Sequence, residues 1–307
     1  MRIDTESLLA GLPDYTVKVS VGQIKKWLRD LDPSKSTCSA DFPAWVSKLC
    51  HEDLCVPLCN LVNHCLRDGI FPEVWKQSEI LPLEKTKCVA SASDFRPISL
   101  LWNLGKILER AIVYFYSDSV IPSIGSDQFA YQKGKSTTDA VMSAIDKWTD
   151  MLDQPNAKSL PVGFLDMSKA FDRMDKSKLI EKLAERGVNR KLIIIIHNFL
   201  SERTQQVKLG EHCSSTLTTK NGTPPGTLTG SMFWLLNIDS LRLSSSKAVK
   251  YTDEFTLTPN PITYSKSELQ NTIDEATRWC DEHNMMANSK KLVIIKLSNI
   301  LNRYVPP

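Results

Sequence analysis

Apolar positions in the first part of the chain recur with the spacing of amphipathic helices. A polar, turn-like stretch at residues 32–36 separates the first two of these runs, and a loop that extends to about residue 93 follows a short extended segment. The predicted elements are helices at residues 21–28, 45–66 and 104–116 and one extended segment at residues 78–83. This part of the chain is therefore expected to be mainly helical.

The pattern changes after a polar turn at residues 154–158, which is the predicted internal boundary. Residues 161–166 form a short apolar run typical of a buried strand, and Asp175 and Gly187 are suited to begin and end the next helix. The later elements are predicted as a helix at 191–200, extended segments at 205–209 and 215–219, a helix at 232–241, a hairpin at 247–258, a helix at 268–283 and a strand at 292–297. This order predicts an α+β layer with one antiparallel sheet backed by helices.

Three carboxylates stand where these strands are predicted to end or turn. Asp166 closes the apolar strand, and Asp253 and Glu254 lie together at the predicted hairpin turn. If strand and hairpin are neighbours in one sheet, the carboxylates converge and repel one another unless a cation such as Mg²⁺ neutralises them. Two such ions, about 3.5–4 Å apart, are the usual clamp for phosphoryl transfer. Ordinary solvated turn acids are the alternative at this point.

Composition and charge narrow the class of protein only a little. The 307 residues carry 38 basic and 35 acidic side chains, so the net charge of +3 permits a polyanionic partner without requiring one. No run approaches the roughly 18 apolar residues of a membrane span, and the first residues lack the pattern of a signal peptide. We therefore expect an intracellular protein, in nucleus or cytoplasm, with no membrane partner and with its eight cysteines reduced.

Two other kinds of site are weighed and rejected. A zinc site is suggested by a cluster of six residues, but its cysteines lack the short C-x2-C spacing and are expected to be small core residues. The cluster consists of Cys50, His51, Cys55, Cys59, His64 and Cys65. A phosphate-binding P-loop needs lysine after its last glycine, whereas Thr227 follows Gly226.

Several ordered segments together resemble one family. The main ones are FLDMSKAFD at residues 164–172, NGTPPGTLTG at 221–230 and KYTDE at 250–254. They resemble the first catalytic motif, the Gly-x-Pro-Gln-Gly loop and the Tyr-Ala-Asp-Asp motif of non-LTR (LINE-type) retrotransposon reverse transcriptases. Further matches are WK at 75–76, DFRPISL at 94–100, Lys106, Glu109, Arg110, QFAYQKGKSTTDA at 128–140, Trp279, Asn288 and Lys291. The resemblance runs in family order from about residue 17 to 298.

The resemblance implies the fingers and palm of a right-hand polymerase, with an antiparallel palm sheet. Residues 1–72 would be a helical N-terminal extension of the fingers, 73–160 the fingers and 161–307 the palm. The reverse transcriptase domain would span about 75–298. No thumb is expected, because the chain stops shortly after the closing strand.

The family's site residues can be placed on this sequence one by one. Asp166, Asp253 and Glu254 fall on the catalytic, metal-binding positions, which imply two Mg²⁺ ions, with Mn²⁺ as a possible substitute. The implied substrates are an RNA template, a DNA primer and deoxynucleoside triphosphates.

Five further residues fall on nucleotide-binding positions. Phe171 would place a ring under the sugar that collides with a 2′-hydroxyl group, or it is a core phenylalanine. Arg96 would pair with triphosphate oxygens, or it forms a structural ion pair. Gly226 would let the backbone approach the nucleotide. Lys85 and Lys291 are weaker phosphate candidates, with solvated lysines as the alternative.

The sequence also departs from the family pattern. Glu254 replaces an aspartate, and its extra methylene moves the carboxylate, while Pro225 replaces a glutamine and lacks a backbone N–H. Thr229 and Ser231 replace a leucine and a proline at the start of the helix that follows, and Cys38 and Ala130 are milder departures. Two hypotheses stay open: an RNA-directed DNA polymerase domain of doubtful activity, and an inactive retroelement-derived fragment that acts at most as a nucleic-acid-binding or interaction module.

Overall fold

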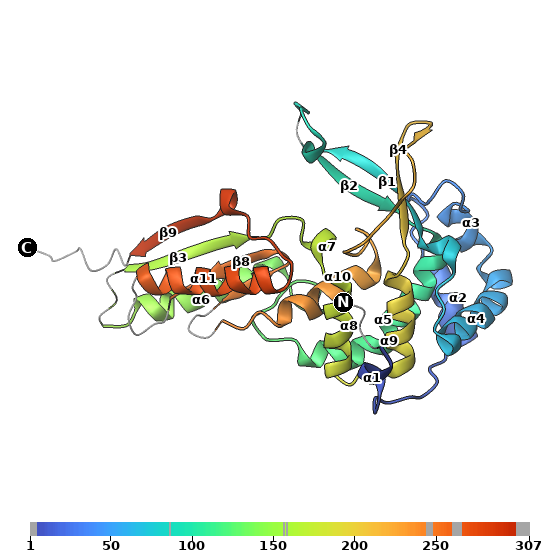
Figure 1. The fold of residues 1–307 in the computed structure, drawn as a ribbon, viewed down its shortest axis with the longest axis horizontal. Helices are drawn as coiled ribbons and strands as arrows, with labels where there is room; N and C mark the ends of the chain where they lie inside the picture. Colours follow the sequence, from blue (N-terminus) through green and yellow to red (C-terminus); the bar gives the residue numbers. More distant parts are fainter. Residues whose placement is uncertain are drawn as a thin grey trace, which may run out of the picture. The chain divides into compact units, whose positions relative to one another are not determined.

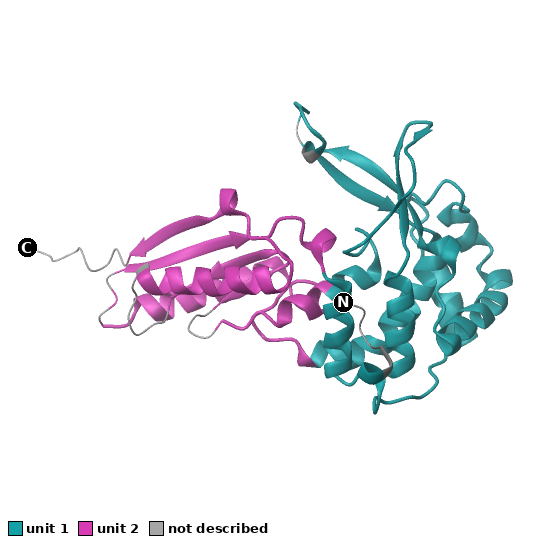
Figure 2. Cartoon of the chain, viewed as in Figure 1, with its two compact units in different colours: residues 1–122, 175–233 teal, residues 123–174, 234–307 magenta. Residues whose placement is uncertain are grey.

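The chain folds into two compact units that are each built from two separate stretches of sequence (Figure 2). The computed structural model describes residues 5–85, 87–155, 157, 159–243, 248–259 and 266–298. Unit 1 comprises Met1–Pro122 and Asp175–Phe233, and unit 2 comprises Ser123–Met174 and Trp234–Pro307. The predicted division into extension, fingers and palm at residues 72 and 160 stays a prediction, because the compact units divide the chain differently, and the predicted turn at 154–158 lies inside unit 2. The reason is that the strand beginning at Ser159 pairs with strands from the end of the chain.

Unit 1 is mostly helical, as expected. Its helices are α1 (Thr5–Leu9), α2 (Val21–Arg29), α3 (Ala44–Leu49), α4 (His51–Asp68), α5 (Asn103–Val120), α8 (Lys176–Glu185) and α9 (Arg190–Leu200) (Figure 1). The single run predicted at 45–66 is divided at Cys50 into α3 and α4, and α4 begins with acidic residues that favour a helix N-terminus. Helices α2 and α4 pack against α5, and α4 also packs against α9, so the first 72 residues belong to the body of unit 1.

Both ends of α8 in unit 1 follow from the local sequence. The Asp175 carboxylate accepts hydrogen bonds from the backbone N–H groups of Ser177 (2.9 Å) and Lys178 (3.3 Å), which caps α8 as predicted. Gly187, beyond the end of the helix, has a φ of +65°, a conformation that favours glycine.

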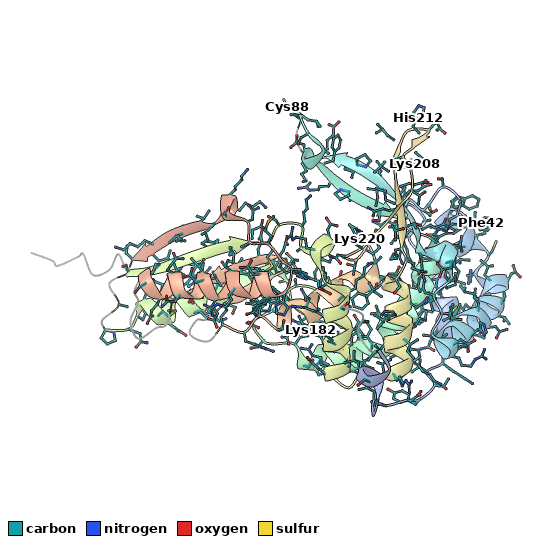
Figure 3. All side chains as sticks on the ribbon, in the orientation of Figure 1. Phe42, Cys88, Lys182, Lys208, His212 and Lys220 are labelled. Atoms are coloured by element: carbon teal, nitrogen blue, oxygen red, sulfur yellow. The ribbon has the colours of Figure 1, made fainter. Side chains whose placement is uncertain are left out.

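A second sheet, which the sequence did not predict, belongs to unit 1. Its strands are β1 (Gln77–Glu84), β2 (Phe95–Leu100), β4 (Thr204–Leu209), β5 (His212–Cys213) and β6 (Leu217–Thr218). Strand β1 pairs antiparallel with β2 and parallel with β4. Strand β2 carries Pro97, which is tolerated because β2 is the edge strand. Figure 3 shows Lys208 on β4, His212 at the tip of the β4–β5 hairpin and Cys88 in the loop between β1 and β2.

Unit 2 contains the antiparallel sheet that the sequence predicted. Its strands are β7 (Val249–Tyr251), β8 (Glu254–Leu257), β3 (Ser159–Asp166) and β9 (Val293–Ser298), in that spatial order. The expectation that the apolar strand and the hairpin are neighbours is confirmed, since β3 pairs with β8. The turn is shifted, because Thr252 and Asp253 form it and Glu254 is the first residue of β8.

Helices cover both faces of this sheet. They are α6 (Thr137–Leu152) and α11 (Lys266–Glu282), with the short α7 (Ala170–Arg173) after β3. Met151 of α6 packs on Leu160 and Val162. The opposite face meets α11, because a Cβ on Gly163 would lie 3.4 Å from Leu269 Cδ1 and successive strand residues face opposite sides. Helix α6 was not predicted, although Ser136 and Asp139 form a capping box at its start.

The remaining helical elements complete the chain. Helix α10 (Leu228–Asp239) contains the boundary between the units. The 3-10 turns among the described residues are η1 (Glu73–Lys76), η2 (Ala92–Asp94), η3 (Ile121–Ser123) and η4 (Ser289–Lys291). Within the described residues, none of the helices combines the length and the apolar character needed to cross a bilayer. All eight cysteines are free thiols, and three of the suspected zinc cluster (Cys55, Cys59 and Cys65) are buried core residues.

Candidate active site

The register of β3 and β8 brings the candidate catalytic residues of unit 2 together. Asp166 and Glu254 are direct partners across the two antiparallel strands. The ladder continues one step further, because the Met167 N–H donates a 3.0 Å hydrogen bond to the Asp253 carbonyl. Asp166 and Glu254 therefore occupy facing positions, and Asp253 sits in the adjoining turn.

Asp166 has two side-chain partners from the segment before β9. Its Oδ2 lies 3.1 Å from Lys291 Nζ and accepts a 3.1 Å hydrogen bond from Asn288 Nδ2. The Asn288 N–H also donates to the Asp166 carbonyl at 2.7 Å. The hydrogen bond to Asp166 raises the pKa of the Lys291 ammonium, and the nearby Asp253 and Glu254 charges act in the same direction. Because the Lys291 side chain is 63% exposed, its ammonium can leave Asp166 without unfolding the site.

The three carboxylates that were predicted as metal ligands lie at facing and adjoining positions. Within the described parts of the chain, no three His, Cys, Asp or Glu side chains gather closely enough to hold one metal ion. The Lys291 ammonium lies 3.1 Å from Asp166 Oδ2 and neutralises that carboxylate. The donor chemistry still fits Mg²⁺, because carboxylate oxygens at three adjoining positions are the hard ligands that this ion prefers.

A pocket of about 400 Å³ lies beside these charged groups. Its apolar wall combines α6 with one face of the sheet and includes Ala140, Ala144, Trp148, Phe164 and Val249. Asp166, Glu254 and Lys291 also line it. An apolar hollow with a few convergent polar groups is the usual form of a ligand site.

A buried ion pair fixes the strand that leads to the carboxylate-bearing turn. Lys250 of β7 is 1% exposed, and its Nζ lies 2.9 Å from Asp127 Oδ2 and donates a 2.6 Å hydrogen bond to the Leu241 carbonyl. The backbones of the same two segments are joined, because the Lys250 N–H donates to the Asp127 carbonyl at 2.8 Å. Sequence analysis missed this pair, since 123 positions separate a turn residue from a strand residue with no local signal.

Phe171 is half-buried in α7, between two other aromatic residues. The Phe171 ring lies 6.4 Å from the Tyr131 ring and 5.6 Å from the Trp234 ring, measured between centroids. Sequence analysis gave no role to Tyr131 or Trp234. Neither residue type nor spacing distinguishes these two from ordinary core aromatics.

The glycine loop of unit 1 is held by a buried carboxylate. Gly226 has a φ of +88°, and the nearest atom to an added Cβ would be the Ser99 carbonyl oxygen at 3.8 Å, so conformation and not crowding requires glycine. Glu109 Oε2 accepts hydrogen bonds from the Leu228 N–H (2.9 Å) and the Thr229 hydroxyl (3.3 Å) at the start of α10. Burial raises the pKa of Glu109, and the Arg203 charge opposes this shift.

The other predicted nucleotide-binding residues are exposed on the β1–β2 hairpin of unit 1. Arg96 lies on β2, and Lys85 directly follows β1, where its backbone N–H donates to the Asp94 carbonyl at 2.8 Å. The structure thus brings together Asp166, Glu254 and Lys291 in unit 2. Arg96, Lys85 and Gly226 belong to unit 1.

Known proteins resemble this chain over most of its length. Residues 83–300 match the reverse transcriptase (RNA-dependent DNA polymerase) family. The RNA-directed DNA polymerase from mobile element jockey of Drosophila melanogaster is 27% identical over 259 residues, which are 79% of this chain and 28% of that protein. The jockey polymerase of Drosophila funebris is 24% identical over 299 residues, 92% of this chain and 32% of its own length.

A third relative comes from a different element. The putative 115 kDa protein in the type-1 retrotransposable element R1DM of Drosophila melanogaster is 28% identical over 191 residues, 60% of this chain and 17% of that protein. The chain spans less than a third of the length of each of these three relatives. Since the family match covers more than half of the chain, this protein belongs to the reverse transcriptase family, within the LINE-type, non-LTR retrotransposon group.

Proposed function

We propose that this chain is the RNA-directed DNA polymerase domain of a non-LTR retroelement, which adds deoxynucleotides to a DNA primer on an RNA template. In this assignment, the sheet of unit 2 is the palm and the β1–β2 hairpin of unit 1 belongs to the fingers. One observation carries the proposal: Asp166 faces Glu254 across two paired strands, beside the turn that contains Asp253. Carboxylates are placed there at the end of an otherwise apolar strand, where a charge is costly without a function or a partner.

Asp166, Asp253 and Glu254 would hold the two Mg²⁺ ions. When bound, the ions would activate the primer hydroxyl and neutralise charge on the phosphates. Lys291 serves as the counter-charge of Asp166 before metal binds. With a metal ion at Asp166, the Lys291 ammonium would be able to approach a phosphate oxygen or to donate a proton to the leaving group.

Four further residues would bind the nucleotide. Phe171 would lie against the sugar and exclude a 2′-hydroxyl group. Arg96 and Lys85 on the β1–β2 hairpin would contact the triphosphate, since a guanidinium group forms paired hydrogen bonds with phosphate oxygens. Gly226 would allow close approach of the loop backbone to the nucleotide.

A second candidate function is an inactive nucleic-acid-binding module. It is favoured by the arrangement at the carboxylates, because Glu254 is exposed at the start of β8 and the described residues contain no three-ligand metal group. A carboxylate that is misplaced by about 1 Å can lower a catalytic rate by roughly 10²-fold. Under this alternative, the chain would still bind a primer–template through a few phosphate contacts, with a steep dependence on salt.

The test is primer extension on poly(rA)/oligo(dT) with Mg²⁺ or Mn²⁺. We expect extension by the unmodified chain, a loss of roughly 10³-fold in Asp166→Asn because a metal ligand is removed, and little change in Asp146→Asn, an exposed control on α6. Extension that is equal in both variants would contradict the polymerase assignment. Salt-sensitive binding of poly(rA)/oligo(dT) without any extension would support the second candidate. A chain that neither binds nor extends poly(rA)/oligo(dT) would contradict both candidate functions.

A further inference from the structure

Three aromatic rings of unit 2 form a row that ends at the turn of the β7–β8 hairpin. The Tyr131 ring meets the Phe171 ring edge-on, at an angle of 86°, and the Phe171 ring lies against the Trp234 ring at 32°. Trp234 Nε1 then donates a 2.8 Å hydrogen bond to the Thr252 carbonyl. These residues come from the segment before α6, from α7, from α10 and from the turn, so only the tertiary fold brings them together.

Both ends of the row are in a backbone conformation that ordinary residues avoid. Tyr131 has a φ of +57°, and Thr252 has a φ of +53°. Such conformations persist only where surrounding contacts hold them, and they concentrate at functional sites. Tyr131 is still 43% exposed, so burial of its ring in a core does not explain the strained backbone.

Trp234 connects Phe171 with the carboxylates. Its side chain is fully buried, and a buried indole N–H needs an acceptor, which here is the backbone of the residue immediately before Asp253. Movement of the turn would therefore move the indole ring that supports Phe171. At the other end of the row, Tyr131 is close enough to Asp253 for that carboxylate to help raise its pKa, after the larger effect of burial.

We propose that Tyr131 and Trp234 are positioning residues for Phe171. Their contacts fix the orientation of the Phe171 ring, which discriminates between deoxyribose and ribose. Because Trp234 is hydrogen-bonded to Thr252, this discrimination also depends on the position of Asp253. The inference rests on the proposed function, in which Phe171 faces the 2′ position of the sugar. It adds a physical basis for sugar discrimination that Phe171 alone does not supply, because a half-buried ring without support could turn aside.

The experiment compares dTTP with UTP on poly(rA)/oligo(dT). Dissociation constants of both nucleotides are measured by calorimetry with and without Mg²⁺, and single-nucleotide addition is measured in parallel. Trp234→Phe keeps the ring contact and removes the hydrogen bond, while Tyr131→Leu removes the outer ring. We expect Trp234→Phe to lower the preference for dTTP roughly fivefold, the size that one net hydrogen bond supports. Tyr131→Leu should lower the preference about tenfold, as expected for loss of an aromatic contact.

Two matched variants serve as controls. Trp279→Phe removes an indole hydrogen bond of similar length, 3.1 Å to Ser240 Oγ, from a different part of unit 2. Tyr131→Phe keeps the ring and removes only the hydroxyl group. Both are expected to retain the preference of the unmodified chain, which separates ring positioning from a general effect on folding. If Trp234→Phe unfolds, the contrast between Tyr131→Phe and Tyr131→Leu decides the question by itself.

The outcomes separate this inference from the proposed function. If the unmodified chain binds neither nucleotide, or binds both equally, the proposed function fails at Phe171 and the inference is overturned with it. If the unmodified chain prefers dTTP and the two test variants keep that preference in full, the proposed function stands and only the positioning role is overturned. A reduced preference with unchanged dTTP affinity would support the inference.

Discussion

Glu109 in unit 1 and Asp166 in unit 2 are both nearly buried carboxylates, 2% and 8% exposed, but their partners differ in kind. Glu109 accepts hydrogen bonds from the start of α10, and its counter-charge is Arg203, which is 1% exposed. Asp166 is paired with Lys291, whose ammonium is largely in solvent. The first carboxylate is enclosed on all sides, whereas the second lies at the end of a strand beside a pocket.

This difference separates a structural charge from a charge available for chemistry. None of the partners of Glu109 can be exchanged without disrupting the core, because an unpaired buried charge is strongly destabilising. The main partner of Asp166 can be exchanged for another cation at small cost, because exposed ion pairs are weak. Burial of the carboxylate does not distinguish the two residues, whereas the exposure of the counter-charge does.

The largest expected effect concerns Glu109, the enclosed carboxylate of unit 1. Glu109→Ala should lower the free energy of unfolding by about 3–5 kcal/mol, because it leaves Arg203 buried without its counter-charge and removes two hydrogen bonds at the start of α10. Urea denaturation measures this change. Glu84→Ala, an exposed control at the end of β1, should stay within about 0.5 kcal/mol of the unmodified chain. Equal losses in the two variants would contradict the assignment of Glu109 as an enclosed structural charge.

A smaller effect is expected in the loop that Glu109 anchors. Gly226→Ala should cost about 1–2 kcal/mol, because alanine must adopt the left-handed conformation seen at this position. Gly22→Ala in the first turn of α2 should have the opposite sign and stabilise unit 1 by up to about 0.5 kcal/mol, since a helix favours alanine over glycine. Thermal denaturation of both variants gives the comparison. A neutral Gly226→Ala would show that the loop backbone is not held in this conformation.

Because the Lys291 partner of Asp166 can be exchanged, its removal should raise the affinity of the site for Mg²⁺. Lys291→Met removes the cation that competes for Asp166, so Mg²⁺ should bind roughly two- to fivefold more tightly, as expected from the weak energy of an exposed ion pair. Calorimetric titration with Mg²⁺ measures the constant, with Lys290→Met, the exposed neighbour, as the control. Weaker binding in Lys291→Met would mean that Lys291 supports the ion and does not compete with it.

The smallest expected effect concerns pH, because the side chain involved is only half-buried. Burial lowers the pKa of Lys176 from 10.5 to about 8 in unit 1. Between these values the unfolded chain holds the proton that the folded chain has lost, so the free energy of unfolding should rise with pH from about 8 to 10.5. Lys176→Met should flatten this rise, whereas Lys220→Met, an exposed control, should retain it. If the free energy of unfolding rose equally with pH in all three proteins, the lowered pKa of Lys176 would be contradicted.

Elements with strong local signals could be predicted from the sequence. Apolar spacing located α5 and α11, and the capping side chain of Asp175 located the start of α8. The pairing of β3 with the β7–β8 hairpin followed from an apolar strand and an alternating hairpin in the same α+β layer. The missed elements include β2, which contains Pro97, and α6, which begins with a capping box.

Other features depend on residues that are distant in the sequence. The parallel pairing of β1 with β4 joins segments more than one hundred residues apart, so no local pattern reveals it. The same holds for the enclosure of Glu109 and for the Lys250–Asp127 pair. In each case the energy comes from burial and from a specific partner, and neither is visible in spacing or composition.

The sequence by itself determined most of the helices, the antiparallel sheet of unit 2 and the residue types at its carboxylate end, because these follow from hydrophobic period and local capping. Tertiary structure alone decided that Asp166 faces Glu254 while Lys291 neutralises it, and that Tyr131, Phe171 and Trp234 form a row to Thr252. The physical reason is that local preferences fix the shape of a segment. Register, ion pairing and ring contacts depend on which distant segments are packed together.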